Sequence, residues 1–275
     1  MKRIDSHQHF WNYTPAVHEW INEEMQVIRK DFLPETLHPI LIENGFEGSV
    51  AVQADQNEEE TNFLIMLAGK NSFIKGVVGW VDLKANNILE RLAHFYQFPI
   101  VKGFRHILQG EDPTFMLQPD FLHGIAALKN FEFTYDLLLY PRHLQNAIQL
   151  VKKNPEQMFV IDHLAKPNIK EGYINEWKKD MQTIAQFPNV FCKVSGMVTE
   201  SDWNNWNKES LFPYLDVVTE SFGVNRLLFG SDWPVCLVAA SFEKMISPIS
   251  EYYGGFTQEN REAIFGENAT QFYHL

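Results

Sequence analysis

Residues 4–11 read IDSHQHFW and open the chain with a short run that ends in two closely spaced histidines. The run is typical of a β-strand. Because side chains alternate between the two faces of a strand, His7 and His9 point the same way, together with Asp5. Two imidazoles side by side on a rigid element can chelate one metal ion. In a chain with 10 histidines such a pair also arises by chance, so its meaning depends on partners elsewhere.

The composition is that of a globular protein, with 275 residues of which 45% are hydrophobic and 21% charged. The net charge of -12 argues against general binding to nucleic acid or to an anionic membrane surface, because both favour a basic face. A small anionic ligand held by one or two local arginines stays compatible with this charge. No stretch of the sequence is apolar and long enough to span a bilayer.

Two further features predict a cytoplasmic protein. The opening Met1-Lys2-Arg3 is basic, but a polar stretch follows it in place of an apolar run, so we expect no targeting segment. The two cysteines, Cys192 and Cys236, are isolated in the sequence. They predict reduced thiols in the core rather than a disulfide framework or a zinc ribbon.

The chain repeats one unit, a short apolar run followed by a polar loop and a helical pattern. The apolar runs are rich in Val, Ile and Phe and are bounded by Gly, Pro, Asn or Asp. They predict strands over residues 3–9, 48–53, 74–81, 100–105, 131–136, 158–162, 190–194 and 226–229. The helical patterns predict helices over residues 34–44, 58–68, 88–95, 118–129, 141–153, 174–185, 211–222 and 242–252, with terminal helices over 259–265 and 269–273.

Eight strands that alternate with eight helices predict a (β/α)8 TIM-type barrel, formed by residues 1–275 as a single domain. A doubly wound open sheet is the alternative. It usually has fewer strands, and no glycine-rich phosphate-binding turn follows the first strand here. The segments 12–33 and 200–210 are long for simple connections and follow the carboxyl ends of strands. We expect them at the mouth of the barrel, where they can cover a substrate.

Polar and aromatic side chains follow nearly every predicted strand, at the rim where barrels build their sites. In chain order these candidates are His7, His9, Gln53, Trp80, Arg105, His106, Asp136, His163, Lys166, Asp232 and Trp233. Each also has a purely structural interpretation: Asp232 as a turn or cap residue, His163 as a hydrogen-bonded core histidine, Arg105 as half of an ion pair. A barrel would nevertheless bring four of them to one pocket, namely His7, His9, His163 and Asp232.

The motifs that carry these residues resemble those of the amidohydrolase superfamily. They are IDSHQHFW at 4–11, GFRH at 103–106, DHLAKP at 162–167, KVSG at 193–196, FGSDWP at 229–234 and IFGENA at 264–269. The ordered set runs from end to end and is similar to the amidohydrolase-2 branch with L-fuconolactonase, L-rhamnonolactonase and 2-pyrone-4,6-dicarboxylate lactonase. The resemblance implies a distorted (β/α)8 barrel that hydrolyses a cyclic ester.

The resemblance also implies a set of site residues. His7, His9 and Asp232 correspond to metal ligands of the superfamily, and His163 and Asp232 to catalytic residues. One divalent ion, with zinc as the first candidate, or no metal at all are both compatible with this branch.

A second metal ion is not expected. Two-metal members of the superfamily have a bridging lysine or glutamate on the fourth strand and a histidine on the fifth. This chain has Arg105 and Asp136 at the ends of those strands, and Lys102 sits too early to bridge.

The implied reaction opens the lactone ring of a sugar acid by attack of water. Asp232 would accept a proton from the water, and a metal would acidify that water and polarise the lactone carbonyl. Without a metal, the histidines would hydrogen-bond the carbonyl oxygen as negative charge develops on it. Asp232 would then return its proton to the leaving ring oxygen.

The expected partner is a small sugar lactone, with no nucleic acid and no membrane. Substrate contacts are expected from Arg105, His106 and Lys166, from Gln53 toward hydroxyls, and from the flat faces of Trp11, Trp80 and Trp233. Because one arginine clearly reaches the rim, a neutral lactone fits better than a dianion. Two alternatives stay open: a zinc-dependent decarboxylase of an aromatic carboxylic acid in the same superfamily, and a barrel that only binds a sugar.

Overall fold

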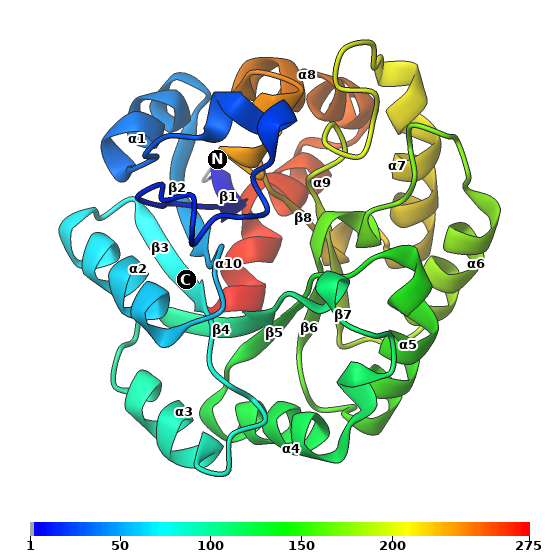
Figure 1. Cartoon of the computed structure of the whole chain (residues 1–275). Coiled ribbons are helices and arrows are strands. Elements are labelled where there is room, and N and C mark those ends of the chain that lie inside the picture. The colour runs from blue at the N-terminus through cyan, green and yellow to red at the C-terminus, as the bar shows by residue number, and fades with distance from the viewer. Residues whose placement is uncertain (1–2) are drawn as a thin grey trace.

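The computed structural model describes residues 3–275, in which eight parallel strands form one sheet in the order β1 to β8 (Figure 1). Met1 and Lys2, the start of the basic opening tripeptide, lie outside the described residues. The strands are β1 Arg3–Gln8, β2 Phe46–Val52, β3 Ile74–Gly79, β4 Val101–His106, β5 Thr134–Leu137, β6 Phe159–Ile161, β7 Val190–Val194 and β8 Leu227–Phe229. Within residues 3–275, no helix combines the length and apolar character needed to cross a membrane.

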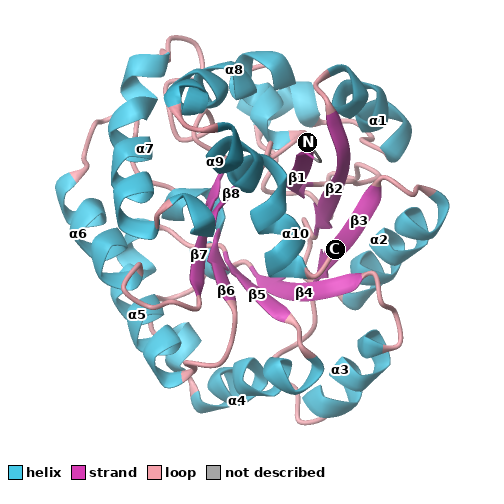
Figure 2. Ribbon diagram, turned by 180° about the vertical axis from the view of Figure 1, so that it is seen from behind, coloured by secondary structure: helices cyan, strands magenta, loops and turns pink. Residues whose placement is uncertain are grey.

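Helices α1 to α8 surround this ring of strands, as both views show (Figure 1, Figure 2). The predicted (β/α)8 TIM-type barrel is therefore confirmed. The helices are α1 Pro34–Glu43, α2 Glu58–Lys70, α3 Ile88–Tyr96, α4 Pro119–Leu128, α5 Leu144–Lys153, α6 Asn175–Ile184, α7 Lys208–Phe222, α8 Phe242–Tyr252, α9 Gln258–Glu262 and α10 Asn268–Tyr273.

Local side-chain chemistry explains where several elements begin. The Asn57 side chain accepts a hydrogen bond from the backbone of Glu60 at 2.7 Å and caps α2. Asn207 does the same for α7, which therefore begins at Lys208 rather than at the predicted residue 211. The predicted strand over 131–136 also begins late, at Thr134, because a 3-10 turn and a left-handed residue, Glu132 (φ 58°), join α4 to β5.

The ring of strands closes where the segment after β8 meets the end of β1. The backbone N–H of Asp232 donates to the His7 carbonyl at 2.8 Å, and that of His9 donates to the Trp233 carbonyl at 2.7 Å. Gly230 permits this approach, because a Cβ at that position would lie 2.7 Å from the Cβ of His7. The seam therefore fixes Asp232 beside His7, in β1, and His9, which directly follows it.

The interior of the barrel differs between its two ends. The helix α10 runs into the middle of the ring of strands in both views (Figure 1, Figure 2). Its Ala269, Phe272 and Tyr273 pack against inward-facing branched residues such as Val50 and Val160. This apolar packing fills the end at which the strands begin, so polar groups gather at the other end.

Candidate active site at the carboxyl ends of the strands

Three histidines direct the same ring nitrogen toward Asp232. His9 uses Nδ1 to hydrogen-bond the Val52 carbonyl at 2.7 Å, and His163 uses Nδ1 to bond the Ser195 hydroxyl at 2.9 Å. Their Nε2 atoms lie 3.5 and 3.8 Å from Oδ1 of Asp232, and Nε2 of His7 lies 3.9 Å from it. Partners on Nδ1 fix the ring orientation, so the Nε2 atoms converge on one point. The structure thus brings together the four residues that the sequence singled out.

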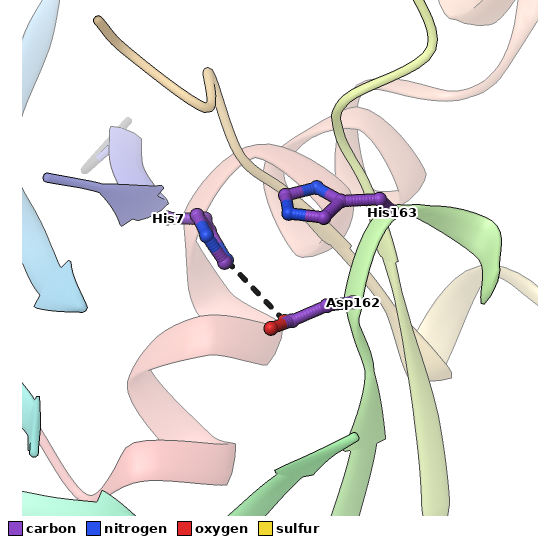
Figure 3. Close-up of side chains that lie close together, drawn as sticks. All are labelled: His7, Asp162 and His163. Carbon is purple, nitrogen blue, oxygen red and sulfur yellow. Dashed lines mark ion pairs between the residues drawn. The ribbon is translucent and has the colours of Figure 1, made fainter. Parts of the chain in front are cut away.

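The ring of His7 is held from behind by charged groups. Its Nδ1 lies 3.3 Å from Oδ1 of Asp162 (Figure 3). Nζ of Lys193 lies 3.0 Å from the same nitrogen. The same lysine contacts Asp136 at 2.5 Å, and Arg105 contacts Oδ2 of Asp162 at 3.0 Å. The two carboxylates and the lysine are fully buried, and Arg105 is nearly so. A layer of two anions and two cations therefore lies directly beneath the histidines.

Burial and neighbouring charges shift the pKa values of the converging residues. Burial lowers the pKa of His9, and it lowers that of His163 to about 4, so both imidazoles are neutral near pH 7. Burial alone would raise the pKa of Asp232, but in the acid range where it titrates the imidazoles of His163, His9 and His7 carry protons, and their attraction outweighs burial and holds its pKa well below the usual range. The centre is thus one carboxylate that faces three neutral imidazoles.

Backbone geometry at the rim is strained. The four residues 163–166 have φ between 49° and 59°, and Asp232 has φ 56°. The left-handed region costs roughly 1–2 kcal/mol per residue for side chains with a Cβ. Gly196, with φ 62°, completes the arrangement, because a Cβ there would lie 2.6 Å from Nδ1 of His163. Strain of this kind gathers where a fold must aim particular side chains.

A cavity of about 460 Å³ opens above the converging residues, and we call it the upper cavity. Segments 12–33 and 200–210, predicted to lie at the mouth, contribute Trp20, Met25 and Trp203 to its wall. Its lining is His9, Trp20, Asn22, Met25, Ala54, Arg105, Ile107, Gln109, Leu138, Tyr140, His163, Lys166, Thr199, Glu200, Trp203, Asp232, Val235 and Val238. Polar or charged residues make up half of this lining and apolar or aromatic residues the other half, so the chamber suits a small molecule with both kinds of surface.

The wall of the upper cavity has an apolar and a polar part. Met25, Val235 and Val238 come from the segments after β1 and β8. On the polar part, Nζ of Lys166 lies 3.0 Å from Oε1 of Glu200. Burial opposes the charge of Lys166, but Glu200 outweighs it and raises the pKa of the lysine. The cavity therefore suits a ligand with one apolar edge and one edge of hydroxyls.

Five of the predicted substrate-binding residues lie outside the lining that residues 3–275 provide: Trp11, Gln53, Trp80, His106 and Trp233. Trp11 is buried, and its Nε1 donates to the Lys30 carbonyl at 2.9 Å. Trp233 packs edge-on against Phe32.

The other three bind neighbours instead of facing the cavity. Nε1 of Trp80 donates to Nδ1 of His106 at 3.3 Å, and the His106 ring stacks on Phe115. Gln53 accepts from Arg105 at 2.8 Å. In the structure these residues contact one another and other residues of the rim. Arg105 and Lys166 line the cavity, and their contact with substrate stays a prediction.

Several residues at the site have no assigned role in the sequence-based prediction. Lys193 and Asp162 belong to motifs that the sequence displays, but a strand pattern does not reveal which side chain turns into the barrel beside another charge. Tyr140 and Glu200 follow β5 and β7, so proximity to a strand end is the signal that marks them.

The donor atoms of His7, His9 and Asp232 fit a divalent ion. A tetrahedral zinc ion with bonds of about 2.0–2.1 Å separates its ligand atoms by about 3.3 Å. The two Nε2 atoms are 3.1 Å apart, and they lie 3.9 and 3.5 Å from Oδ1 of Asp232. Two neutral imidazoles and one carboxylate are also a donor set that zinc accepts. Held there, an ion would face the upper cavity.

Comparison with known proteins adds to this geometry. The family described as "Amidohydrolase" matches residues 4–275. An L-fucono-1,5-lactonase of Burkholderia multivorans is 37% identical over 99% of this chain and 96% of its own length. A second L-fucono-1,5-lactonase, from Burkholderia ambifaria, is 33% identical over the same shares of the two chains. A crystal structure of a Burkholderia multivorans amidohydrolase with bound zinc superposes with a TM-score of 0.97 at 37% identity, over 100% of both chains.

Proposed function

The chain belongs to the amidohydrolase family, and from this premise we propose that it is an enzyme that opens the ring of a sugar-derived lactone to the free sugar acid. The single observation that carries the proposal is the convergence of three Nε2 atoms on Oδ1 of Asp232 below a cavity of about 460 Å³. The similarity to two L-fucono-1,5-lactonases over almost the whole chain supports aldonolactones such as L-fuconolactone or L-rhamnonolactone as substrates. One domain, over residues 1–275, would carry the activity.

Asp232 acts as the general base in this mechanism. Its carboxylate faces the cavity and takes a proton from the attacking water. The neutral His163, fixed by Ser195 at 2.9 Å, holds its Nε2 toward the same point and stabilises the oxygen on which negative charge develops. Protonated Asp232 then returns the proton to the ring oxygen as the ester bond breaks. A carboxylate with a low pKa is a weak base, so the water must be acidified by another group.

We propose that one divalent ion, zinc first, supplies this help. His7, His9 and Asp232 would hold it, and the zinc-bound Burkholderia multivorans relative supports this choice. When bound, such an ion acidifies the attacking water and polarises the lactone carbonyl. Arg105 lines the same space, with Nη1 3.3 Å from Nε2 of His7, and would bind an oxygen of the substrate beside the reacting carbonyl.

From the apolar and polar parts of the cavity wall we propose an orientation for the sugar. Its hydroxyls would face Tyr140, Lys166 and Glu200, where donors and acceptors are fixed by the ion pair. Its apolar edge would lie against Met25, Val235 and Val238. A lactone whose C6 is a methyl group matches the apolar part of the wall better than one whose C6 is a hydroxymethyl group, because burying an unpaired hydroxyl is unfavourable.

A lactone panel tests the proposal. Acid release from L-fuconolactone, L-rhamnonolactone and L-galactonolactone is followed with a pH indicator, and spontaneous hydrolysis in buffer is subtracted. We expect turnover of the first two, with a lower kcat/KM for the third. Carbon dioxide release from an aromatic acid without lactone turnover would instead establish a decarboxylase, and binding without turnover would establish a sugar-binding barrel.

Metal analysis of the purified protein, paired with activity after chelation, tests the role of the ion. We expect bound zinc, and we expect chelation to reduce lactone turnover and zinc to restore it. Unchanged turnover in metal-free protein would mean that no metal ion is needed and that the histidines support the reaction by hydrogen bonds to the carbonyl oxygen. We also propose that the enzyme works in the cytoplasm on a small soluble lactone, because Cys192 and Cys236 are buried free thiols suited to a reducing compartment.

A further inference from the structure

A second set of metal-ligand atoms lies directly beside the first. His7, Asp162 and His163 offer nitrogen and oxygen atoms within 4.8 Å of one another, and all three residues are buried (Figure 3). His7 belongs to both sets, with Nε2 turned toward Asp232 and Nδ1 toward Asp162. If only the donor atoms are counted, the centre has ligands for two metal ions.

The ammonium group of Lys193 already contacts two members of this second set, His7 and Asp162. Its Nζ is 3.0 Å from Nδ1 of His7, 3.0 Å from Oδ1 of Asp162 and 2.5 Å from Oδ2 of Asp136. The lysine is fully buried, and its contacts come from β1, β5 and the turn after β6. Two carboxylate oxygens and one imidazole nitrogen around a single positive charge are the surroundings that a bound divalent ion would have.

The charge balance explains why a cation is required there. Asp136 and Asp162 are completely buried, and a buried carboxylate without a partner costs several kcal/mol. Arg105 pairs with Oδ2 of Asp162, which leaves Oδ1 turned toward the lysine. Within residues 3–275, this Oδ1 accepts no well-formed hydrogen bond, so its contact with Lys193 is electrostatic. Such an oxygen can accept a metal ion as readily as an ammonium.

We infer that the Lys193 ammonium takes the place of a second metal ion and thereby restricts this centre to a single ion. The inference rests on the proposed function for the first ion, at His7, His9 and Asp232. It assigns Lys193 as a positioning residue, because it holds the ring of His7 and the carboxylates of the layer beneath without facing the upper cavity. The single-ion centre then follows from a cation built into β7 as well as from missing ligands.

Zinc content tests this inference without any substrate. The full chain is dialysed against excess zinc, desalted, and analysed for zinc per chain. We expect at most one zinc in the unsubstituted protein and one additional zinc per chain in Lys193→Ala. Lys193→Arg keeps the positive charge, and Lys166→Ala removes a cavity lysine that pairs with one carboxylate only. Both should bind as much zinc as the unsubstituted protein.

A second variant locates the added ion. In a His9→Asn background the first site loses a ligand, so Lys193→Ala/His9→Asn should retain the additional zinc. Thermal unfolding with and without zinc covers the case in which Lys193→Ala is unstable. A variant that folds only with zinc supports the inference, because the ion then supplies the missing charge.

Three outcomes would overturn it: two zinc ions in the unsubstituted protein, no additional zinc in a folded Lys193→Ala variant, or a variant that zinc cannot restore. Because zinc content is measured without a lactone, any of these would leave the lactonase proposal standing. A lactone panel without turnover would conversely leave the zinc count unaffected.

Discussion

Each end of the barrel has a cavity, but the reactive groups of an active site converge at the upper cavity and not at the lower one. The upper cavity, about 460 Å³, opens at the carboxyl ends of the strands. The lower cavity, about 370 Å³, opens where the strands begin, beside α10. Its lining is Tyr96, Phe98, Pro99, Val101, Lys102, Phe131, Glu132, Phe133, Tyr273 and His274. Both are rich in aromatic side chains and of similar size, so neither volume nor apolar character separates them.

The difference lies in how the polar groups converge. In the lower cavity, Nζ of Lys102 donates to the carbonyl of His274 at 2.8 Å, so the chain itself satisfies the charge. In the upper cavity, Asp232 meets imidazole nitrogens of His9, directly after β1, and His163, in the turn after β6. Parallel strands deliver side chains from several segments to one rim, and that convergence creates reactive chemistry. A cavity becomes a site when buried groups from different strands share one point.

The largest effect on turnover is expected when Asp232 is replaced, and it tests the contrast between the two cavities. Asp232→Asn keeps the size of the side chain but removes the base and one donor of the metal set. We expect lactone turnover to fall about 10³-fold or more. The matched change at the lower cavity, Lys102→Met, should leave turnover within about twofold, because most substitutions away from a site act on stability alone. Initial rates at saturating lactone measure both.

An Asp232→Asn enzyme with nearly normal rates would remove this residue as the base. A large loss in Lys102→Met, with the protein still folded, would instead connect the lower cavity to the chemistry and erase the contrast between the two mouths.

A second prediction concerns pH and the support of the upper rim. Glu60 accepts hydrogen bonds from the backbone of Ala54 and Asp55, and burial raises its pKa from 4.5 to about 7. The folded state therefore holds this proton more tightly than the unfolded chain does. Its contribution to the free energy of unfolding is fully present below pH 4.5 and is lost as the pH rises to about 7. The loss amounts to up to about 3 kcal/mol.

Glu60→Gln cannot titrate, so it should flatten the pH dependence of stability over this range. The amide also loses one acceptor, which lowers stability at acid pH. The test is therefore the slope of the free energy of unfolding against pH, not its absolute value. Urea unfolding at several pH values measures it. Equal slopes for the variant and the unsubstituted protein would mean that Glu60 ionises normally in the folded state.

The sequence predicts a site residue where the direction of its side chain is set by its own strand. It does not predict one whose direction is set by other segments of the chain. Strand alternation is local, so His7 and His9 were predictable from β1, and the barrel pattern added His163 and Asp232. Trp11 follows the same strand, yet it turns away to pack in the segment that covers the mouth. Which way an aromatic residue turns after a strand depends on that segment, and the strand pattern carries no information about it.

The charged layer beneath the histidines was hidden for a related reason. Lys193 is buried because Asp136 arrives from β5 and Asp162 from the turn after β6. Burial of a lysine is unfavourable on its own, so the strand predicted over residues 190–194 does not indicate that the Lys193 side chain is buried. Only the assembled barrel shows that two cations, Lys193 and Arg105, compensate the two buried carboxylates. The resemblance to a family supplied the ligands of the first ion, but it contained no role for this lysine.

A third prediction, of a smaller effect on kcat, separates a steric contact with His163 from backbone strain in the left-handed region. Gly196→Ala would place a methyl group 2.6 Å from Nδ1 of His163 and force the ring to move. A misplacement of this size is expected to cost about tenfold to a hundredfold in kcat. Gly172 offers the matched control, since its φ of 70° is similar and no atom lies within 4 Å of an added Cβ.

Gly172→Ala should therefore lower the melting temperature slightly and leave kcat unchanged. Initial rates and melting temperatures of both variants make the test. If the two variants lose activity equally, the left-handed backbone rather than the contact with His163 would be responsible.

The smallest expected effect tests whether the upper rim stores strain. Ala165 is buried in the left-handed run 163–166, with φ 59°. Ala165→Gly relieves roughly 1–2 kcal/mol of backbone strain. It loses about 0.8 kcal/mol of methyl burial and about 0.5–1 kcal/mol to the greater freedom of the unfolded chain. These contributions nearly cancel, so the free energy of unfolding should change little.

Ala127 is buried in the regular helix α4 and serves as the comparison, because it loses the same methyl group without any strain to relieve. Ala127→Gly should cost about 2 kcal/mol, the sum of the helix penalty and the lost burial. Urea unfolding of both variants measures the difference, which should be about 1–2 kcal/mol. Equal losses would mean that the turn carrying His163 and Lys166 is relaxed. The orientation of His163 would then be set by its contacts with Ser195 and Gly196 alone, and not by a backbone held under tension.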